Sequence, residues 1–222
     1  MKEHPIIFSA PMVQAILAER KSMTRRIIKP QPDDNGVSYM KNPPLDWEQF
    51  YNDTWKPWKW DTDRGESIAK FCPYGEPGDT LWVRETFSHN GLSSMNGGQL
   101  FYKANEQYGK YTGIIWKPSI HMPRAAARIF LRITDIRIER LNDISEEDAI
   151  AEGIAIEDDG HMCWHYGYKD FRFILPEESF ESLWESISGK DSWESNPWVW
   201  VISFEKINQA SVDPLLLSQG DA

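Results

Sequence analysis

The sequence predicts an α+β protein with about six β-strands in a mixed sheet or barrel, short helices and long loop insertions. Six segments have the alternating or continuous apolar pattern of strands. Three further segments have the spacing of amphipathic helices. Strands and helices do not alternate regularly along the chain, which argues against a doubly wound sheet built from βαβ units.

The first elements are expected to be a strand, a helix and a second strand. Residues 5–9 (PIIFS) read as a short strand, and Pro11 suits the first turn of a helix that runs to about Arg20. Residues 24–29 (TRRIIK) form the next expected strand. Strand alternation places three of its side chains on one face: Thr24, Arg26 and Ile28.

The remaining expected strands cover residues 79–86, 100–104, 127–141 and 198–207. In residues 127–141, apolar and polar side chains alternate strongly, but the alternation slips by one position near Asp135, which predicts a β-bulge or bend. The last (WVWVISFEKI) is apolar at almost every position, which predicts a strand buried on both faces.

Two more helices are expected in the second half of the chain. Ser145 is a suitable N-cap for a short helix, with Asp148 three residues later as its capping-box partner and Gly153 at its end. Residues 176–188 form an amphipathic helix that ends before Gly189. Its apolar stripe is Phe180, Leu183, Trp184 and Ile187.

The length of 222 residues suits one large domain or one domain with insertions. We expect a single domain over residues 1–207, interrupted by insertions at about 31–70, 88–124 and 155–175, where periodicity is weak. Residues 208–222 have nothing to pack and are expected to be a disordered tail.

The net charge of −10 argues against a protein that coats nucleic acid without specificity, because its average surface repels phosphates. The charge is uneven, since residues 20–29 (RKSMTRRIIK) hold five basic side chains and no acidic one. This segment suits local capture of an anionic ligand, and the alternative is a solvated basic edge.

The cysteine count and the hydropathy predict a cytoplasmic protein. Cys72 and Cys163 are the only two cysteines, too few for a disulfide framework, so a reducing compartment is the simpler interpretation. No apolar run approaches the roughly 20 residues of a membrane span. The apolar stretch within residues 1–9 is also too short for a signal peptide.

Residues 16–26 (ILAERKSMTRR) resemble the signature of the ASCH family, whose pattern is roughly G-x-K-x-x-T-x-R after the first helix. Lys21, Thr24 and Arg26 match this pattern. Glu19 stands where the family usually has glycine, which predicts a less sharp helix end. The segments PGDTLWVRE, ISEEDAIAEG and WVWVISFEKI resemble later family segments in the same order. The resemblance implies a PUA-like β-barrel, and the long insertions resemble members encoded by phages and prophages.

One bacterial branch of this family is similar to N4-acetylcytidine amidohydrolase, in which a lysine, a threonine and a glutamate carry the chemistry. By motif position these residues are Lys21, Thr24 and Glu152. The resemblance implies an amidohydrolase of acylated nucleosides or bases that needs no metal and no cofactor. By this resemblance Thr24 is expected to be the nucleophile and Glu152 the base, and Lys21 is expected to orient the hydroxyl or meet the oxyanion. Glu152 is then expected within hydrogen-bond reach of Thr24 or Lys21.

A binding module is the alternative function. The same barrel then holds RNA, DNA or a modified base without chemistry, through five candidate ligand contacts: Arg20, Arg25, Arg26, Trp82 and Arg84. A third possibility is a phage-encoded protein that targets a host protein in the cytoplasm of an infected cell. A membrane partner is not expected.

Two further clusters have weaker functional interpretations. Lys56 and Lys59 lie among four tryptophans, which suits base stacking but more often marks the private core of an insertion. These tryptophans are Trp47, Trp55, Trp58 and Trp60. His161, Cys163 and His165 share a face of an extended segment, and Cys72 is a candidate fourth zinc ligand, but no C-x-x-C spacing supports the site.

Overall fold

The computed structural model describes residues 1–29, 31, 72–89, 100–105, 113–156, 163–164 and 173–208. Most of the expected insertion at 31–70, much of the other two, and nearly all of the expected tail lie outside these residues. The four tryptophans of the first insertion, together with His161 and His165, also lie outside.

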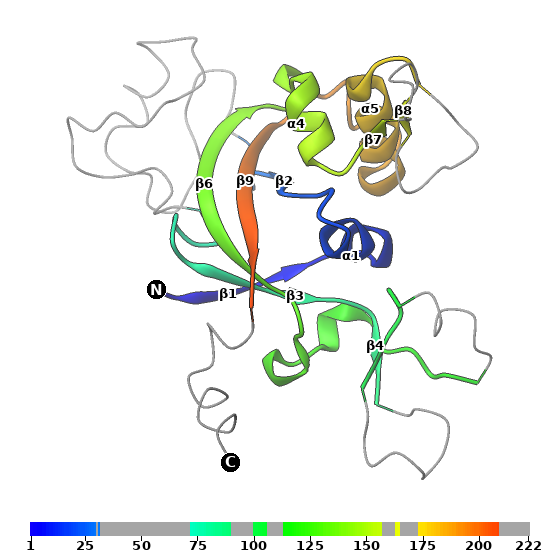
Figure 1. Cartoon of the computed structure of the whole chain (residues 1–222). Helices are drawn as coiled ribbons and strands as arrows, with labels where there is room; N and C mark the ends of the chain where they lie inside the picture. Colours follow the sequence, from blue (N-terminus) through cyan, green and yellow to red (C-terminus); the bar gives the residue numbers. More distant parts are fainter. Residues whose placement is uncertain are drawn as a thin grey trace.

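The described chain is α+β, as predicted, with a five-stranded mixed sheet in the order β1–β3–β6–β9–β2 (Figure 1). Its strands are β1 (Glu3–Ile7), β2 (Met23–Ile27), β3 (Thr80–Arg84), β6 (Phe130–Arg140) and β9 (Trp198–Ile207). The pair β1–β3 is parallel, and the other three pairs are antiparallel. The helices are α1 (Ala10–Leu17), α4 (Glu146–Ala151) and α5 (Pro176–Ser188).

Shorter elements complete the described fold. Two small antiparallel pairs are formed by β4 (Phe87–Ser88) with β5 (Phe101–Tyr102), and by β7 (Ala155–Ile156) with β8 (Cys163–Trp164). Short 3-10 turns cover Ser119–His121, Arg124–Ala126 and Leu141–Asp143. The sequence did not predict β4, β7 or β8, because two-residue strands have no periodicity to detect.

The strand β9 lies between two hydrophobic cores. Alternation sends Trp200, Ile202 and Phe204 into the core beneath α1, which also contains residues of β1, β3 and β6. Val199 and Val201 point the other way, into a second core formed with α4 and α5. Four consecutive residues of β9 are buried, Val199 to Ile202, which confirms the prediction of a strand buried on both faces over that stretch.

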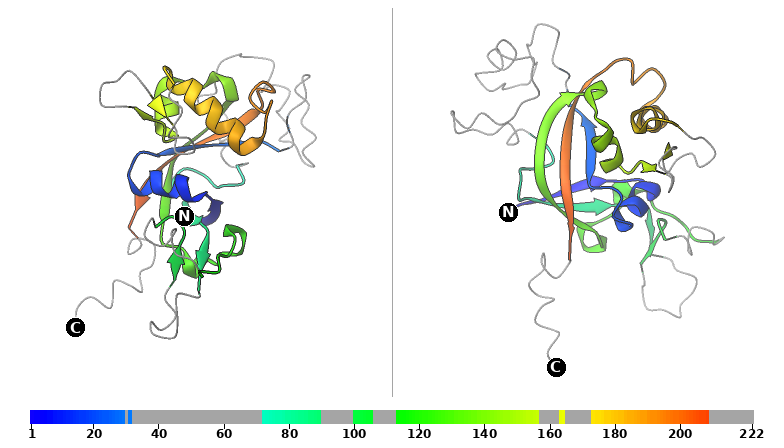
Figure 2. Two further views of the ribbon diagram at one scale, coloured as in Figure 1. Left: turned by 90° about the vertical axis from the view of Figure 1, so that its right-hand side faces the viewer. Right: turned by 45° about the horizontal axis from the view of Figure 1, so that its top comes forward.

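The longest strand, β6, curves around the sheet, as the views of Figures 1 and 2 show. Its register with β9 shifts between Ile133 and Asp135, so the predicted bulge is confirmed. A bulge bends its strand and increases the local twist, which allows β6 to follow the curvature of the sheet.

The two edge strands, β1 and β2, come together through a side chain. Arg26 of β2 donates a hydrogen bond from Nη2 to the carbonyl of Ile7, the last residue of β1, over 2.7 Å. No backbone pairing joins the two strands in the described residues, so the sheet is open and a closed barrel is not shown. The helix α1 connects β1 to β2 beside this opening (Figure 1).

The end of α1 differs from the sequence expectation. The helix stops at Leu17 rather than near Arg20, and Glu19 adopts a left-handed conformation with φ of 60°. The amide of Arg20 bonds to the carbonyl of Ala15, and the amide of Glu19 to that of Ile16. This is a complete Schellman motif, so the expectation of a less sharp helix end was wrong: glutamate takes the conformation that glycine usually supplies.

Replacing Glu19 by glycine is expected to leave the free energy of unfolding unchanged or to raise it by up to about 1 kcal/mol. Glycine removes the left-handed strain, and this gain exceeds the added entropy of the unfolded chain and the loss of an exposed contact with Lys206. Urea denaturation of the two proteins measures the difference. A loss above 1 kcal/mol would contradict the assigned conformation, and Glu19→Ala serves as the control that retains the strain.

The helices of the second half agree closely with their patterns. The helix α5 covers the predicted residues, and Gly189 follows it with φ of 99°. The cap of α4 is only half of the predicted capping box: the Oγ of Ser145 accepts from the amide of Asp148, whereas the Asp148 carboxylate binds arginines instead. No helix in the described part of the chain is long and apolar enough to cross a membrane.

Candidate functional site

A pocket of about 500 Å³ lies along β2, between the concave side of the sheet and α5. Its walls combine the end of α4, one face of α5, a segment before β3 and every residue from 24 to 29. The lining residues are Met12, Thr24, Arg25, Arg26, Ile27, Ile28, Lys29, Pro73, Tyr74, Glu152, Phe180, Leu183, Trp184, Ile187, Ser188 and Trp200.

A buried ion pair lies at one end of this pocket. Lys21 donates from Nζ to Oε2 of Glu152 over 2.5 Å and to the Glu152 main-chain carbonyl over 2.9 Å. The exposed fractions of the two side chains are 0% and 5%. The expected proximity of Lys21 and Glu152 is therefore confirmed, although 131 residues separate them in sequence. Their catalytic roles stay predictions.

The pair is held because two loops run antiparallel to each other. Arg20, Lys21 and Ser22, which lead into β2, bond in turn to the carbonyls of Gly153, Glu152 and Ala151 at the end of α4. Gly153 ends α4 with φ of 105°, which turns the chain at this point. Three successive bonds fix Lys21 against Glu152 before any ligand is present.

Burial lowers the pKa of Lys21 from its ordinary value, against the opposing attraction of the Glu152 carboxylate. The positive charges of Arg26 and Arg25 add to the lowering. Lys21 is not among the pocket-lining residues, so it contacts the site through Glu152. The structure thus favours the orienting role over direct contact with an oxyanion.

The second oxygen of Glu152 has no hydrogen-bond donor. Oε1 is buried and accepts no hydrogen bond, and Nη1 of Arg25 lies 3.5 Å from it. Thr24 is 2% exposed and lines the same pocket. A buried carboxylate oxygen without a hydrogen-bond donor is uncommon, and its position in the pocket wall points to a proton-bearing ligand atom beside it.

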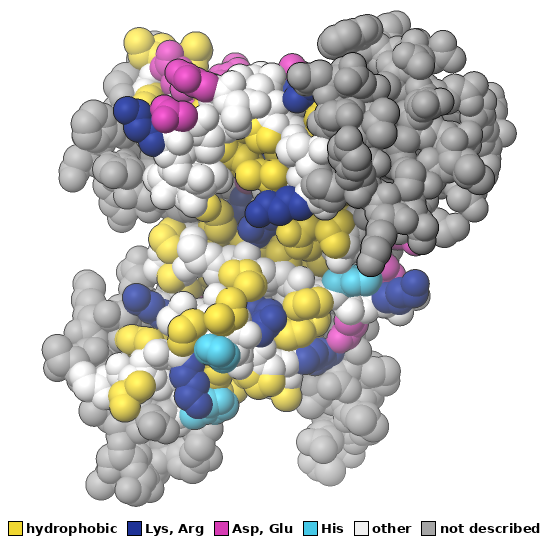
Figure 3. Space-filling view, turned by 180° about the vertical axis from the view of Figure 1, so that it is seen from behind, with side chains coloured by type: hydrophobic (Ala, Val, Ile, Leu, Met, Phe, Trp, Pro, Cys, Tyr) yellow, Lys and Arg dark blue, Asp and Glu magenta, His cyan; other side chains and the backbone are white. Residues whose placement is uncertain are grey.

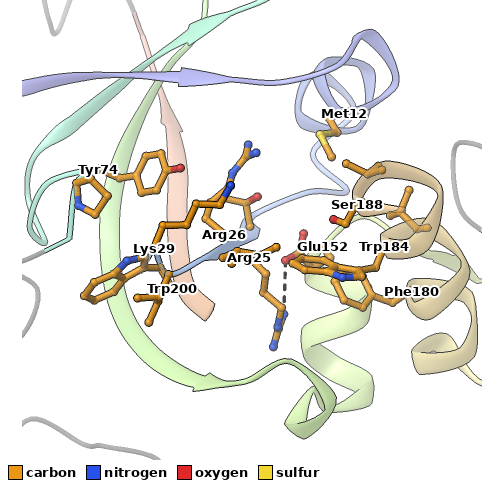
Figure 4. Close-up of a pocket in the computed structure, with 16 residues that line it drawn as sticks. Met12, Arg25, Arg26, Lys29, Tyr74, Glu152, Phe180, Trp184, Ser188 and Trp200 are labelled. Atoms are coloured by element: carbon orange, nitrogen blue, oxygen red, sulfur yellow. Dashed lines mark ion pairs between the residues drawn. The ribbon is translucent and has the colours of Figure 1, made fainter. Parts of the chain in front are cut away.

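Arg25 is the centre of a buried charge network rather than an exposed cation. Its Nη2 lies 2.5 Å from Oε1 of Glu139 and 2.6 Å from Oδ2 of Asp148, and its side chain is 0% exposed. Arg137 contacts the same two carboxylates. The arginine expected to contact a ligand therefore binds carboxylates of the protein, and Figure 4 shows its ion pair with Glu152.

The other basic residues, Arg26 of β2 and Lys29 just after it, are more exposed than Arg25. Arg26 is half-buried, with its guanidinium 5.1 Å from the centre of the Phe8 ring. Lys29 is exposed and lines the pocket at the far end of the strand from Thr24. Figure 3 shows basic and hydrophobic side chains gathered in the middle of one face of the molecule, whereas acidic side chains lie mainly toward its edges.

Aromatic side chains form much of the pocket wall, although no pattern in the sequence assigned these residues to a site. Figure 4 shows Phe180 and Trp184 beside Glu152, with Tyr74 and Trp200 at the opposite end near Lys29. The spacing of the sequence predicts the apolar stripe of α5, but as part of the hydrophobic core rather than of a site. Its last member, Ile187, is 57% exposed and lines the pocket. Tyr74 and Trp200 carry no sequence signal for a site, because only the fold brings them to β2.

Three of the predicted ligand contacts do not line this pocket. Arg20 donates to the Gly153 carbonyl at the end of α4. Trp82 and Arg84 lie on β3, where the Arg84 guanidinium is 5.5 Å from the centre of the Trp82 ring and also donates to the carbonyl of Ile120. Any ligand role of these three residues requires a surface other than this pocket.

The two cysteines lie in different hydrophobic cores, Cys72 beneath α1 and Cys163 beside α5. Burial raises the pKa of Cys72 to about 12, and it also raises the pKa of Cys163. No cluster of three metal-ligating side chains occurs within the described ranges, and the two histidines of the candidate zinc site fall outside them.

Comparison with protein-family models, with curated proteins and with solved structures finds no match to this chain. The resemblance of residues 16–26 to the ASCH signature therefore stays a prediction.

Proposed function

We propose that this protein is an ASCH-type amidohydrolase that removes an acyl group from the amino nitrogen of a modified nucleoside or base. The observation that carries the proposal is the buried Lys21–Glu152 pair at a pocket whose wall also contains Thr24. These are the three residues that the motif resemblance assigns to the reaction. The contact between the ends of β1 and β2 supports the PUA-like barrel of that family.

In this mechanism Thr24 attacks the acyl carbon through Oγ1 while Glu152 accepts the hydroxyl proton on Oε1. The tetrahedral intermediate collapses, the C–N bond breaks, and Glu152 returns the proton to the leaving amine. An ester of Thr24 remains. Water then attacks the ester with Glu152 again accepting a proton, and the carboxylic acid leaves as the Thr24 hydroxyl is restored.

The charges around Thr24 suit both steps. Lys21 holds Oε2 of Glu152 and leaves Oε1 without a hydrogen-bond donor, so Oε1 can accept the proton. Arg26 shares a face of β2 with Thr24, so its positive charge lies on the side of the nucleophile, whereas the charge of Arg25 on the other face is balanced by Glu139 and Asp148. A preorganised positive field stabilises the oxyanion of the intermediate. No step requires a metal ion or an organic cofactor.

The test is turnover of N4-acetylcytidine and related N-acylated nucleosides, followed by chromatographic detection of the free nucleoside. Thr24→Ala is expected to lower kcat by at least about a thousandfold, as loss of a nucleophile does elsewhere. Thr24→Ser retains a hydroxyl and is the matched control, with activity well above that of Thr24→Ala. Equal rates for wild type and Thr24→Ala would exclude Thr24 as the nucleophile.

The basic opening of the pocket favours a second candidate, a module that binds RNA, DNA or a modified base without turnover. The observation behind it is the position of Arg26 and Lys29 along the pocket wall, where cations suit phosphate. Absence of turnover by wild type, together with salt-sensitive oligonucleotide binding that Arg26→Ala abolishes, would replace the hydrolase by this module. If the protein shows neither turnover nor oligonucleotide binding, the remaining hypothesis is a protein that binds a host protein.

A further inference from the structure

The strand β2 has one free edge, because it is the last strand of the described sheet and pairs only with β9. Two bonds show which of its residues face β9: the amide of Ile28 bonds to the carbonyl of Trp198, and the amide of Phe204 bonds to the carbonyl of Ser22. In an antiparallel pair the bonded residues alternate. The even-numbered residues of β2 therefore face β9, and the amides and carbonyls of Arg25 and Ile27 point to the free edge.

The pocket follows this free edge. Its lining includes every residue from Thr24 to Lys29, and consecutive residues of a strand project to opposite faces. A cavity that contacts all six must therefore run along the side of the strand. Within the described residues, the main-chain groups of Arg25 and Ile27 on this side have no hydrogen-bond partner in the protein.

Unpartnered main-chain groups are unusual here, because Arg25 is 4% exposed and Ile27 is half-buried. Buried amides and carbonyls are nearly always paired with protein, water or ligand. Other residues that line the pocket also have buried side-chain atoms without a hydrogen bond, among them Oε1 of Glu152 and Nε1 of Trp184. Several unmet donors and acceptors in one cavity indicate that a polar ligand completes them.

We infer that the free edge of β2 recognises the base of the substrate: the carbonyl of Arg25 accepts from the exocyclic amide N–H, and the amide of Ile27 donates to the adjacent ring nitrogen. The carbonyl of one residue and the amide of the second residue after it are neighbours on the same strand edge. An amino heterocycle presents the complementary pair, an N–H beside a ring nitrogen. This inference rests on the proposed function, whose substrate class it narrows.

The arrangement selects N-acylated amino bases whose exocyclic nitrogen is next to a ring nitrogen, as in cytosine and adenine. It also places the acyl group on the side of Thr24 and Glu152, since Thr24 precedes Arg25 on the strand. An acyl group on a ribose oxygen lies away from the N–H and ring-nitrogen pair. We therefore expect O-acylated nucleosides to bind through their base but not to be hydrolysed, because their acyl group is not placed beside Thr24.

The test compares ligands that differ by one atom. The dissociation constants of N4-acetylcytidine and its 3-deaza analogue, in which C–H replaces the ring nitrogen, are measured by calorimetry with the Thr24→Ala variant. We expect the analogue to bind roughly tenfold more weakly, because the Ile27 amide then loses its acceptor. Turnover of N4-acetylcytidine by wild type is measured in parallel.

A backbone variant tests the same bond from the protein side. Ile27→Pro deletes the amide hydrogen at an edge position, where proline is tolerated, and Ile27→Ala removes the side chain but keeps the hydrogen. In the Thr24→Ala background, the preference for N4-acetylcytidine is expected to disappear with Ile27→Pro and to persist with Ile27→Ala. If Ile27→Pro does not fold, the two-ligand comparison decides alone.

The outcomes separate the two proposals. Wild-type turnover together with equal dissociation constants for the two ligands would overturn recognition by the strand edge and leave the hydrolase standing. Absence of both turnover and binding of N4-acetylcytidine would overturn the hydrolase and this inference with it. Turnover with the expected preference, lost only in the proline variant, supports both.

Discussion

Replacing Lys21 by methionine is expected to lower the free energy of unfolding by about 3–5 kcal/mol, because the variant leaves the Glu152 carboxylate buried without its partner. Methionine fills a similar volume, so the loss reports charge rather than packing. Arg25 lies 3.5 Å from the other carboxylate oxygen and moderates the loss without replacing the 2.5 Å contact. Urea denaturation followed by tryptophan fluorescence measures the change.

The double variant Lys21→Met/Glu152→Met is the matched control. It removes both charges together, and replacing a complete buried pair by apolar residues costs far less than breaking it. Most of the lost stability is therefore expected to return in the double variant. A single variant within about 1 kcal/mol of wild type would show that Glu152 is solvated or protonated when Lys21 is absent.

Replacing Arg25 by methionine is expected to have an effect at least as large, about 3–5 kcal/mol, because three carboxylates depend on this one guanidinium. Glu139 and Asp148 contact its Nη2, and Glu152 lies beside its Nη1. Arg137 remains bound to two of the three but is more exposed, so its compensation is partial. Thermal and urea denaturation measure the loss.

Two comparisons give this prediction its control. Arg25→Lys retains the charge but cannot bridge several carboxylates with a planar fork, so an intermediate loss is expected. Arg124→Met breaks the exposed pair with Glu3, and a much smaller change is expected there. Similar losses from Arg25→Met and Arg124→Met would mean that burial of the network contributes little to stability.

The sequence predicted those parts of the fold that have long, regular patterns. The bounds of α5 and β9 agree with the structure residue for residue, because the helix has a clear stripe and the strand an unbroken apolar run. The bulge near Asp135 was visible as a slip in alternation. The ends of β1, β2 and α1 shifted by a few residues, because their limits depend on tertiary hydrogen bonds rather than on local propensity.

The site was predictable only where a motif joined distant residues. The ASCH-like pattern predicted that Glu152 lies close to Thr24 or Lys21, and the structure places Glu152 in contact with Lys21. No pattern indicated that Arg25 faces the carboxylates of β6 and α4, because alternation on β2 does not say what covers each face. The aromatic side chains of α5 were also not assigned to the site, because residues that pack in a core and residues that contact a ligand have the same spacing on a helix.

The position of β9 between β6 and β2 also sets the order in which the chain can fold as it leaves the ribosome. β2 is made long before β9: Val199 follows its partner Ile27 by 172 residues, and Ser203 follows its partner Met23 by 180. Until β9 emerges, β2 has no strand beside it, and both hydrophobic cores lack their shared wall. Pairings of such long separation form slowly, so the nascent chain exposes apolar strands for most of its synthesis. This protein is therefore expected to depend on chaperones that shield unfinished chains.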